Sequence, residues 1–311
     1  AEQSYSRVIT IFEGLRDNNP NSVYWYRNIA VGRERLGRLY ATGVAESMSL
    51  MSQLAAATGA EGVSATTQFE LTADAAVWAQ LERSFENYDT ATSIVGVLVD
   101  ADASVLEWHQ DLAALNVGMA RLTITAGNVE AARQYVDAAR AIVNELIEEE
   151  HEDVFTNLNV LETWLASGRL NLLSGDPMAA RQEFEDALAR AERLIEVTTE
   201  RNTWLKYVAE SYDGIGDSAY YQNDFEKAAE SYSKALAIRD SLAIKVPDNV
   251  MWRLQQAVSA YKLALLEEHV GGESSTRARN QALLLFNRLD SDGHLPAPVR
   301  LTLDQIESYR P

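Results

Sequence analysis

The sequence predicts an all-α fold of stacked helical hairpins, and two observations carry the prediction. Three turn signals recur at intervals of 48 residues: Gly127-Asn128, Gly175-Asp176 and Asn223-Asp224. After each turn, small and large residues recur at offsets of 4, 3 and 7, which places them on one helix face. A fixed period of this length is typical of proteins whose repeats stack into one continuous core.

Each repeat is predicted to be a helix, a short turn and a second helix. Small residues mark the first helix, where the two helices must approach closely: Ala120, Gly168 and Gly216. The second helix carries an alanine, a large residue, an alanine and a leucine in the same phase of every repeat. These positions are Ala132, Ala180 and Ala228; Val136, Phe184 and Tyr232; Ala139, Ala187 and Ala235; and Leu146, Leu194 and Leu242.

Tryptophan marks the start of several first helices, twelve residues before a small residue. Trp25, Trp108, Trp204 and Trp252 have this spacing, but Trp25 and Trp108 are 83 residues apart where two repeats would give 96. We therefore expect one solenoid over residues 1–311 with four parts. Residues 1–57 begin in mid-repeat, 58–101 form an irregular unit with a loop at Thr58–Gln68, 102–290 are regular repeats, and 291–311 end in a capping helix over Val299–Tyr309.

The two ends of the chain resemble each other. Residues 3–25 align without a gap to residues 230–252, with identical residues at eight positions that include Tyr5, Ile11, Leu15 and Trp25. The later segment is a second helix followed by the start of the next repeat, so the first helix of the chain lacks its partner. We expect Ala1 to be a cut inside a longer protein. The exposed apolar face, at Val8, Ile11, Phe12 and Leu15, could drive homodimerisation.

Composition excludes several classes of function. The chain has 311 residues and a formal charge of 27 − 46 = −19, which disfavours nucleic acid as a partner. No apolar run reaches the length of a membrane span. The absence of cysteine excludes disulfides and thiolate chemistry. It does not fix the compartment; we expect a cytoplasmic protein, with a periplasmic one as the alternative.

The repeats resemble the tetratricopeptide (TPR) family. Tyr212, Ile215, Gly216, Ala228, Tyr232 and Ala235 have the spacing of its signature, and Gly168, Ala180, Phe184 and Ala187 match the same slots. The 48-residue form resembles the TPR tails of large bacterial signalling and defence proteins, in which the repeats follow an effector domain. The resemblance implies five or six hairpins in a right-handed superhelix with a concave, partner-binding groove.

Motifs for chemistry are scarce, and no cofactor, metal site or catalysis is expected. The four histidines stand alone in their repeats, at His109, His151, His269 and His294, where surface or packing roles are expected. The run Asp213-Gly214-Ile215-Gly216 lies inside a first helix without a preceding strand, which argues against a dinucleotide loop. Gly216 is better explained as a site of close helix packing.

Mapping the groove positions of the TPR family onto this chain predicts a partner-binding surface on the first helices. Its residues are Arg121, Glu162, Arg169, Glu210, Asp213, Asp217, Tyr221, Tyr261 and Lys262. Asp213 and Asp217 occupy slots where a carboxylate clamp would need cations or amides, so a basic or amphipathic segment is the expected ligand. An alternative is that these residues only solubilise the groove. Asp213→Lys is expected to weaken binding and leave the melting temperature unchanged.

The sequence thus predicts a protein-interaction module: a sensor, scaffold or autoinhibitory arm that binds a protein or peptide. A stand-alone peptide-sensing regulatory receptor or a periplasmic scaffold is the alternative. A further alternative is an enzyme that uses the solenoid as a scaffold; it would need two carboxylates facing each other across the superhelix, which a sequence alone cannot show.

Overall fold

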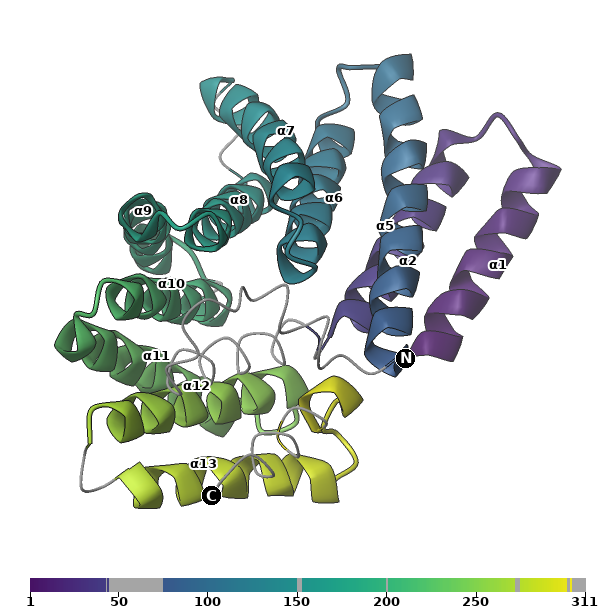
Figure 1. The fold of residues 1–311 in the computed structure, drawn as a ribbon. Helices are drawn as coiled ribbons and strands as arrows, with labels where there is room; N and C mark the ends of the chain where they lie inside the picture. The colour runs from purple at the N-terminus through teal and green to yellow at the C-terminus, as the bar shows by residue number, and fades with distance from the viewer. Residues whose placement is uncertain are drawn as a thin grey trace. The chain divides into compact units, whose positions relative to one another are not determined.

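The computed structural model describes residues 1–42, 44, 75–149, 153–199, 201–271, 275–300 and 303. In this part of the chain the regular secondary structure is helical (Figure 1), which confirms the predicted all-α class. The predicted loop at Thr58–Gln68 lies outside the described residues, as do His151 and most of the predicted capping helix. No described helix combines the length and the apolar character needed to cross a bilayer.

The chain divides into two compact units, and the boundary falls after Ala166, inside a helix. The first unit contains residues 1–42 and the described residues of 73–166. Its helices are α1 (Glu2–Asn18), α2 (Val23–Ala41), α5 (Ala75–Ala101), α6 (Leu106–Thr125), α7 (Val129–Glu148) and the first part of α8 (Val154–Leu173). Consecutive helices pack on one another: α1 on α2, α2 on α5, α5 on α6 and α6 on α7.

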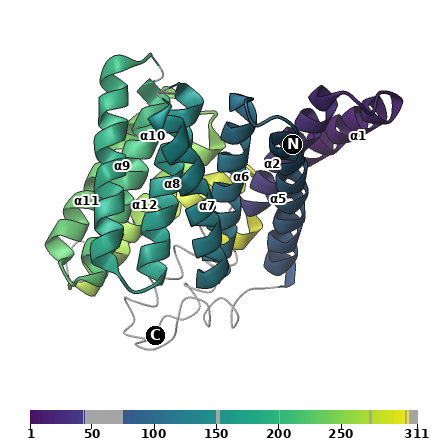
Figure 2. The same cartoon turned by 90° about the horizontal axis from the view of Figure 1, so that it is seen from above.

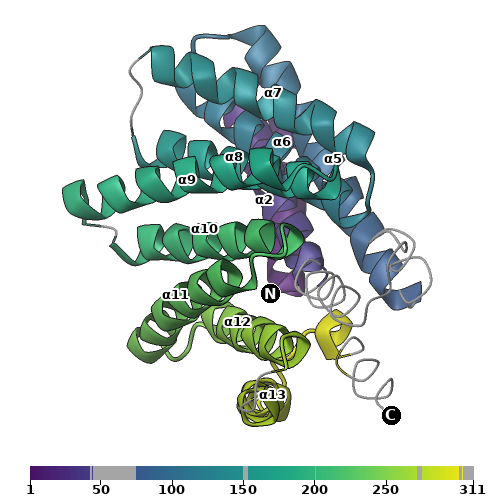
Figure 3. The same cartoon turned by 60° about the vertical axis from the view of Figure 1, so that its left-hand side comes forward.

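The second unit contains the described residues from Ser167 onward. After the end of α8 it consists of α9 (Pro177–Val197), α10 (Arg201–Tyr221), α11 (Phe225–Lys245), α12 (Val250–His269) and α13 (Ser275–Ser291). Here α10 packs against both α9 and α11, and α12 packs against both α11 and α13. Figure 3 shows this succession from α9 to α13, and Figure 2 shows α9 to α12 from above. The packing of consecutive helices fits a helical repeat.

The three turns predicted from the 48-residue spacing share one geometry. Gly127, Gly175 and Asn223 have φ values of 72°, 79° and 60°, the left-handed conformation that ends a helix. The next residue in each turn caps the following helix, since Asn128, Asp176 and Asp224 each accept a hydrogen bond from the backbone N–H three residues later. The turn chemistry is therefore repeated along with the sequence.

The large residue of each second helix packs against glycines of the first helices. A Cβ added to Gly168 or to Gly214 would meet the ring of Phe184, and one added to Gly216 would meet the ring of Tyr232. In the first unit the ring of Tyr88 lies in the same way against Gly37 and Gly118. These contacts confirm that the small residues mark close helix packing.

The predicted irregular unit contains a long, continuous helix. Within α5, Ser84, Tyr88, Ala91 and Leu98 are all buried. These are the positions that sequence phase assigns to a second helix, so the regular pattern resumes within α5. Near the other end of the chain, Leu295, Val299 and Leu303 are buried in one cluster with residues of α12 and α13. The segment after α13 therefore covers the last hairpin.

Candidate functional site

Two of the nine predicted groove residues lie in the first unit, on α6 and α8. A nitrogen of Arg121 lies 3.9 Å from a carboxylate oxygen of Glu162. The arginine side chain is partly exposed, whereas the glutamate is nearly buried. The pair is electrostatically coupled to the buried hydroxyl of Tyr88, whose pKa is raised to about 12, chiefly by burial. The structure thus brings Arg121 and Glu162 together.

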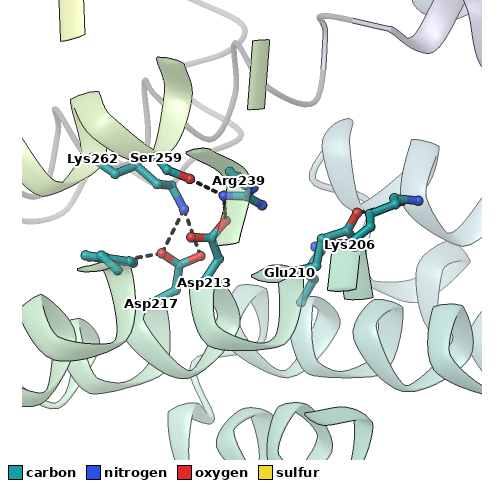
Figure 4. A network of polar contacts seen from close by, with 9 residues as sticks. Lys206, Glu210, Asp213, Asp217, Arg239, Ser259 and Lys262 are labelled. Atoms are coloured by element: carbon teal, nitrogen blue, oxygen red, sulfur yellow. Dashed lines mark hydrogen bonds and ion pairs between the residues drawn. The ribbon is translucent and has the colours of Figure 1, made fainter. Parts of the chain in front are cut away.

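The other seven predicted residues lie in the second unit, where five belong to a polar cluster around α10. We call this the α10 cluster: Arg169, Lys206, Glu210, Asp213, Asp217, Tyr232, Arg239, Ser259 and Lys262. Figure 4 shows its carboxylates projecting from α10, with Lys262 and Arg239 directed toward Asp217 and Asp213. The cluster contains four cationic and three acidic side chains, so its acidic groups are neutralised internally.

Glu210 is held by two cations. Arg169 on α8 lies 3.4 Å from one of its oxygens, and Lys206, one turn earlier on α10, lies 3.6 Å from the other. The Glu210 side chain is only 6% exposed, but that of Arg169 is 35% exposed. The sequence spacing is the same as in the first unit, because Arg121 precedes Glu162 by 41 residues and Arg169 precedes Glu210 by 41. An ion pair between successive first helices is thus repeated with the 48-residue period.

Asp217 lies between Lys262 and Tyr232. Its Oδ1 accepts hydrogen bonds from the Tyr232 hydroxyl at 2.6 Å and from the Lys262 ammonium at 2.9 Å. The ammonium also lies 5.4 Å from the centre of the Tyr232 ring, which permits a cation–π contact. Burial, together with the nearby charge of Asp217, raises the pKa of Tyr232 well above its ordinary value. The hydroxyl therefore stays a hydrogen-bond donor to Asp217.

Asp213 forms a buried ion pair with Arg239 of α11, and Arg239 also donates to Ser259 of α12. The Arg239 side chain is 6% exposed and that of Asp213 is 15% exposed. Asp213 is therefore an internal residue rather than a free groove carboxylate. Our expectation that Asp213→Lys would leave the melting temperature unchanged does not fit this placement, because a lysine there would face a buried guanidinium.

The two predicted tyrosines differ in accessibility. Tyr221, at the end of α10, is half exposed, whereas Tyr261 is fully buried and packs edge-on against Phe286 of α13. Tyr261 is thus part of the core rather than the groove. Its position is 48 residues after Asp213 and 96 after Leu165, which is also buried. This phase of the repeat faces inward, which the family mapping did not take into account.

Sequence reasoning missed Lys206, Tyr232, Ser259 and Arg239 as members of the site. One signal for Arg239 was present. The same phase holds Val143 and Ala191 in earlier repeats, both fully buried, so a charged residue there requires a buried partner. Asp213, in the same hairpin, likewise occupies a repeat position that holds aliphatic residues, Val117 and Leu165, in the earlier repeats. Two charges of opposite sign at core positions of one hairpin indicate an internal pair.

The described part of the chain offers no cluster of three or more metal-ligating side chains. His269 packs against the rings of Tyr220 and Phe225. A nitrogen of the His109 ring lies 2.9 Å from the carbonyl oxygen of Ala103.

No model of a known protein family matches the sequence, and no curated protein matches it. Among solved structures, the crystal structure of BtubC (BKLC) from P. vanneervenii is similar to this chain. The match has a TM-score of 0.54 and 15% identity, and it covers 96% of this chain and 93% of that chain. At this identity the likeness concerns the fold alone.

Proposed function

We propose that the chain is a protein-interaction module of the TPR type, with a right-handed superhelix whose first helices bind a protein or peptide segment. The 48-residue period, the shared turn geometry and the small residues at helix crossings support membership of this family. The resemblance to the repeat tails of bacterial signalling and defence proteins suggests a role as their sensor, scaffold or autoinhibitory arm. No catalysis by this chain is part of the proposal.

The observation that carries the proposal is an arginine at one phase of three first helices. Arg38, Arg121 and Arg169 each follow the small residue of their helix. Each is partly exposed, and each lies within 4 Å of a carboxylate that is at most 12% exposed. A guanidinium offers five N–H donors in a fixed plane. Contact with a nearly buried glutamate orients that plane, while 35–47% of each arginine side chain remains exposed.

The ligand that fits these arginines is an extended or amphipathic segment recognised through its carbonyl oxygens. Each guanidinium is already neutralised by its glutamate, so the ligand needs no net charge. The prediction of a basic ligand from the sequence depended on the negative charges of Asp213 and Asp217. Arg239 and Lys262 neutralise these carboxylates inside the α10 cluster, which removes most of the support for a basic ligand. Tyr221 adds an exposed aromatic surface at the end of α10.

The test is selection of peptides from a displayed random library against the full chain, followed by affinity measurements with Arg169→Ala. This substitution removes the donors but leaves Lys206 paired with Glu210, so the variant is expected to fold. Arg193→Ala is the matched control, because Arg193 is an exposed arginine on the neighbouring helix α9. Circular dichroism and melting curves of both variants confirm the fold.

The expected result is a loss of about tenfold or more in affinity for Arg169→Ala and no change for Arg193→Ala, since one lost hydrogen bond with a charged group is worth about 1.5–3 kcal/mol. Failure to select any peptide, or equal binding by both variants, would refute the proposed surface.

A further inference from the structure

The ring of Tyr88 lies between two first helices of the first unit. A Cβ added to Gly37 of α2 or to Gly118 of α6 would meet this ring, and the two helices also contact each other. Gly37 directly precedes Arg38, and Gly118 lies one turn before Arg121 on the same face of α6. The hydroxyl at the end of the ring therefore lies beside the charged side chains that follow these glycines.

Two arginines and two glutamates are the electrostatic neighbours of this hydroxyl: Arg38, Glu34, Arg121 and Glu162. A nitrogen of Arg38 lies 2.6 Å from an oxygen of Glu34, and one of Arg121 lies 3.9 Å from an oxygen of Glu162. The glutamate side chains are 12% and 10% exposed, whereas the arginine side chains are 47% and 40% exposed. The cationic groups are thus the ones that a ligand can reach.

The Tyr88 hydroxyl forms no hydrogen bond within the described part of the chain, although the residue is only 4% exposed. Tyr232, at the same position of its repeat, donates to Asp217, the residue after the glycine against which its ring packs. The corresponding residue on α2 is Arg38, whose guanidinium has no acceptor to offer. A buried O–H group without an acceptor is costly, so this donor is available to an acceptor from outside.

We infer that Tyr88, Arg38 and Arg121 form a site for one carboxylate, the aspartate or glutamate side chain of a bound protein segment. The two oxygens of a carboxylate can accept from the hydroxyl and from guanidinium N–H groups together. The hydroxyl belongs to a side chain that is far less exposed than those of the arginines, so the acceptor must reach inward on a stem, which a main-chain carbonyl lacks. The inference rests on the proposed function for the presence of a segment and adds the group that this site selects.

The local charge fits one negative group. Arg35 also lies near Glu34, at 3.4 Å, so the three arginines and two glutamates of this site leave a single positive charge. A carboxylate balances this charge, whereas a phosphate dianion exceeds it and is repelled by the two glutamates. The corresponding rings of the second unit offer no such donor, because Phe184 has no hydroxyl and the hydroxyl of Tyr232 is held by Asp217.

The probe is N-acetyl-glutamate N-methylamide, a blocked amino acid whose single carboxylate is its side chain. The glutamine counterpart is the neutral control. Binding to the full chain is followed by NMR of isotope-labelled arginine side chains, through the Nε–H signal of Arg121, which is identified by its loss in Arg121→Gln. Tyr88→Phe removes the hydroxyl and keeps the ring. Tyr24→Phe is the matched control, because Tyr24 is a tyrosine of α2 that is 60% exposed.

Saturable binding of the glutamate probe is expected, and the glutamine counterpart should bind about tenfold or more weakly. Tyr88→Phe should weaken glutamate binding by about tenfold, because a hydrogen bond with a charged group is lost, and Tyr24→Phe should bind like the wild type. Equal binding by the two variants, or no saturable shift, overturns the inference. Tighter binding of inorganic phosphate, or of N-acetylglycine, whose carboxylate is a chain end, would assign the arginines to another group and also overturn it.

The outcome is distinguishable from a failure of the proposed function. If peptides that depend on Arg169 are selected but the glutamate probe does not bind, the carboxylate site alone is refuted. If the probe binds as expected but no peptide can be selected, the proposed function fails and the carboxylate site stands. Where a selected peptide contains an acidic residue at this site, its replacement by the amide should remove the difference in affinity between the wild type and Tyr88→Phe.

Discussion

Arg239 donates a hydrogen bond to the carboxylate of Asp213, and both side chains are almost entirely removed from water. Each member of the pair occupies a position that the preceding repeat fills with a buried aliphatic residue, Leu165 for Asp213 and Ala191 for Arg239. The hairpin of α10 and α11 thus has an ion pair between its two helices, at repeat positions that hold aliphatic residues in the preceding repeat. Because either charge alone would be buried without compensation, the two substitutions are interdependent.

Asp213→Leu is expected to destabilise the chain by about 3–5 kcal/mol, because it leaves the Arg239 guanidinium buried without its carboxylate. The double variant Asp213→Leu/Arg239→Ala restores the residues of the preceding repeat and should recover most of that loss. Urea unfolding of the wild type, both single variants and the double variant measures the coupling as a double-mutant cycle. A single variant as stable as the wild type would contradict the assignment of a buried pair.

Gly216→Ala is expected to lower stability by about 1–3 kcal/mol, as overpacking of a core does. The added Cβ would stand 2.6 Å from the nearest atom of the buried Tyr232 ring. Gly96→Ala in α5 is the matched control, because its added Cβ would meet no heavy atom within 4 Å beyond its chain neighbours and the backbone of its own helix. In a helix this exchange alone should stabilise by about 0.5–1 kcal/mol. Opposite signs of the two changes in urea unfolding would support the packing role of Gly216, and equal signs would count against it.

Periodicity in the sequence was enough to locate the hairpins. Gly127, Gly175 and Asn223 could be recognised because turn and cap residues are local signals, and the small residues because every helix crossing repeats the same steric demand. The residues that join the hairpins into a polar site were harder to recognise. Arg239 comes from a second helix, which a mapping of first-helix groove positions does not consider, and its contact with Asp213 depends on the reach of a long side chain.

Asn223 offers a test of the repeated turn. Its φ of 60° is unfavourable for most side chains, and the corresponding residues of the other two turns are Gly127 and Gly175. Asn223→Ala is expected to destabilise by about 1 kcal/mol, since alanine lacks the tolerance of asparagine for this conformation. Asn223→Gly should change stability by less than about 0.5 kcal/mol. Thermal and urea unfolding distinguish these results, and an alanine variant as stable as the glycine variant would argue against a strained turn.

Tyr88 should make stability depend on alkaline pH. Burial raises the pKa of its hydroxyl from 10.0 to about 12, so the folded state keeps a proton that the unfolded state loses near pH 10. Its stabilising contribution is complete below pH 10 and is lost as the pH rises toward 12. Between pH 8 and pH 11 the wild type is expected to lose about 1 kcal/mol more than Tyr88→Phe.

Urea unfolding of the two proteins at several pH values measures this difference. Tyr88→Phe retains the ring that packs against Gly37 and Gly118, so the comparison isolates the hydroxyl. Parallel stability curves for the two proteins from pH 8 to pH 11 would show that the buried hydroxyl does not control the alkaline response.

Tyr261 is a residue for which the groove mapping from the TPR family was wrong. The groove mapping treated it as a surface residue, but it shares a repeat phase with the buried Leu165 and lies in the core beside Phe286. The sequence alone indicated that this repeat position faces the core, because Val117 and Leu165, which occupy it in the earlier repeats, are both apolar. The solvent exposure of Arg38, Arg121 and Arg169 was not available from the sequence, because it depends on how the neighbouring helices pack around each side chain.

The contacts of Phe184 and Tyr232 fix the order in which the repeats can follow one another. Phe184 needs a glycine on the next first helix, at position 214. Tyr232 meets Lys262 at the corresponding position, where Asp217 binds both of them. If the 48 residues between these positions were lost, Lys262 would face an uncharged phenyl ring, and Arg169 would stand where Asp217 had been. The repeats of this unit resemble one another in shape, but their interfaces are not interchangeable, so gain or loss of a whole repeat would leave mismatched neighbours.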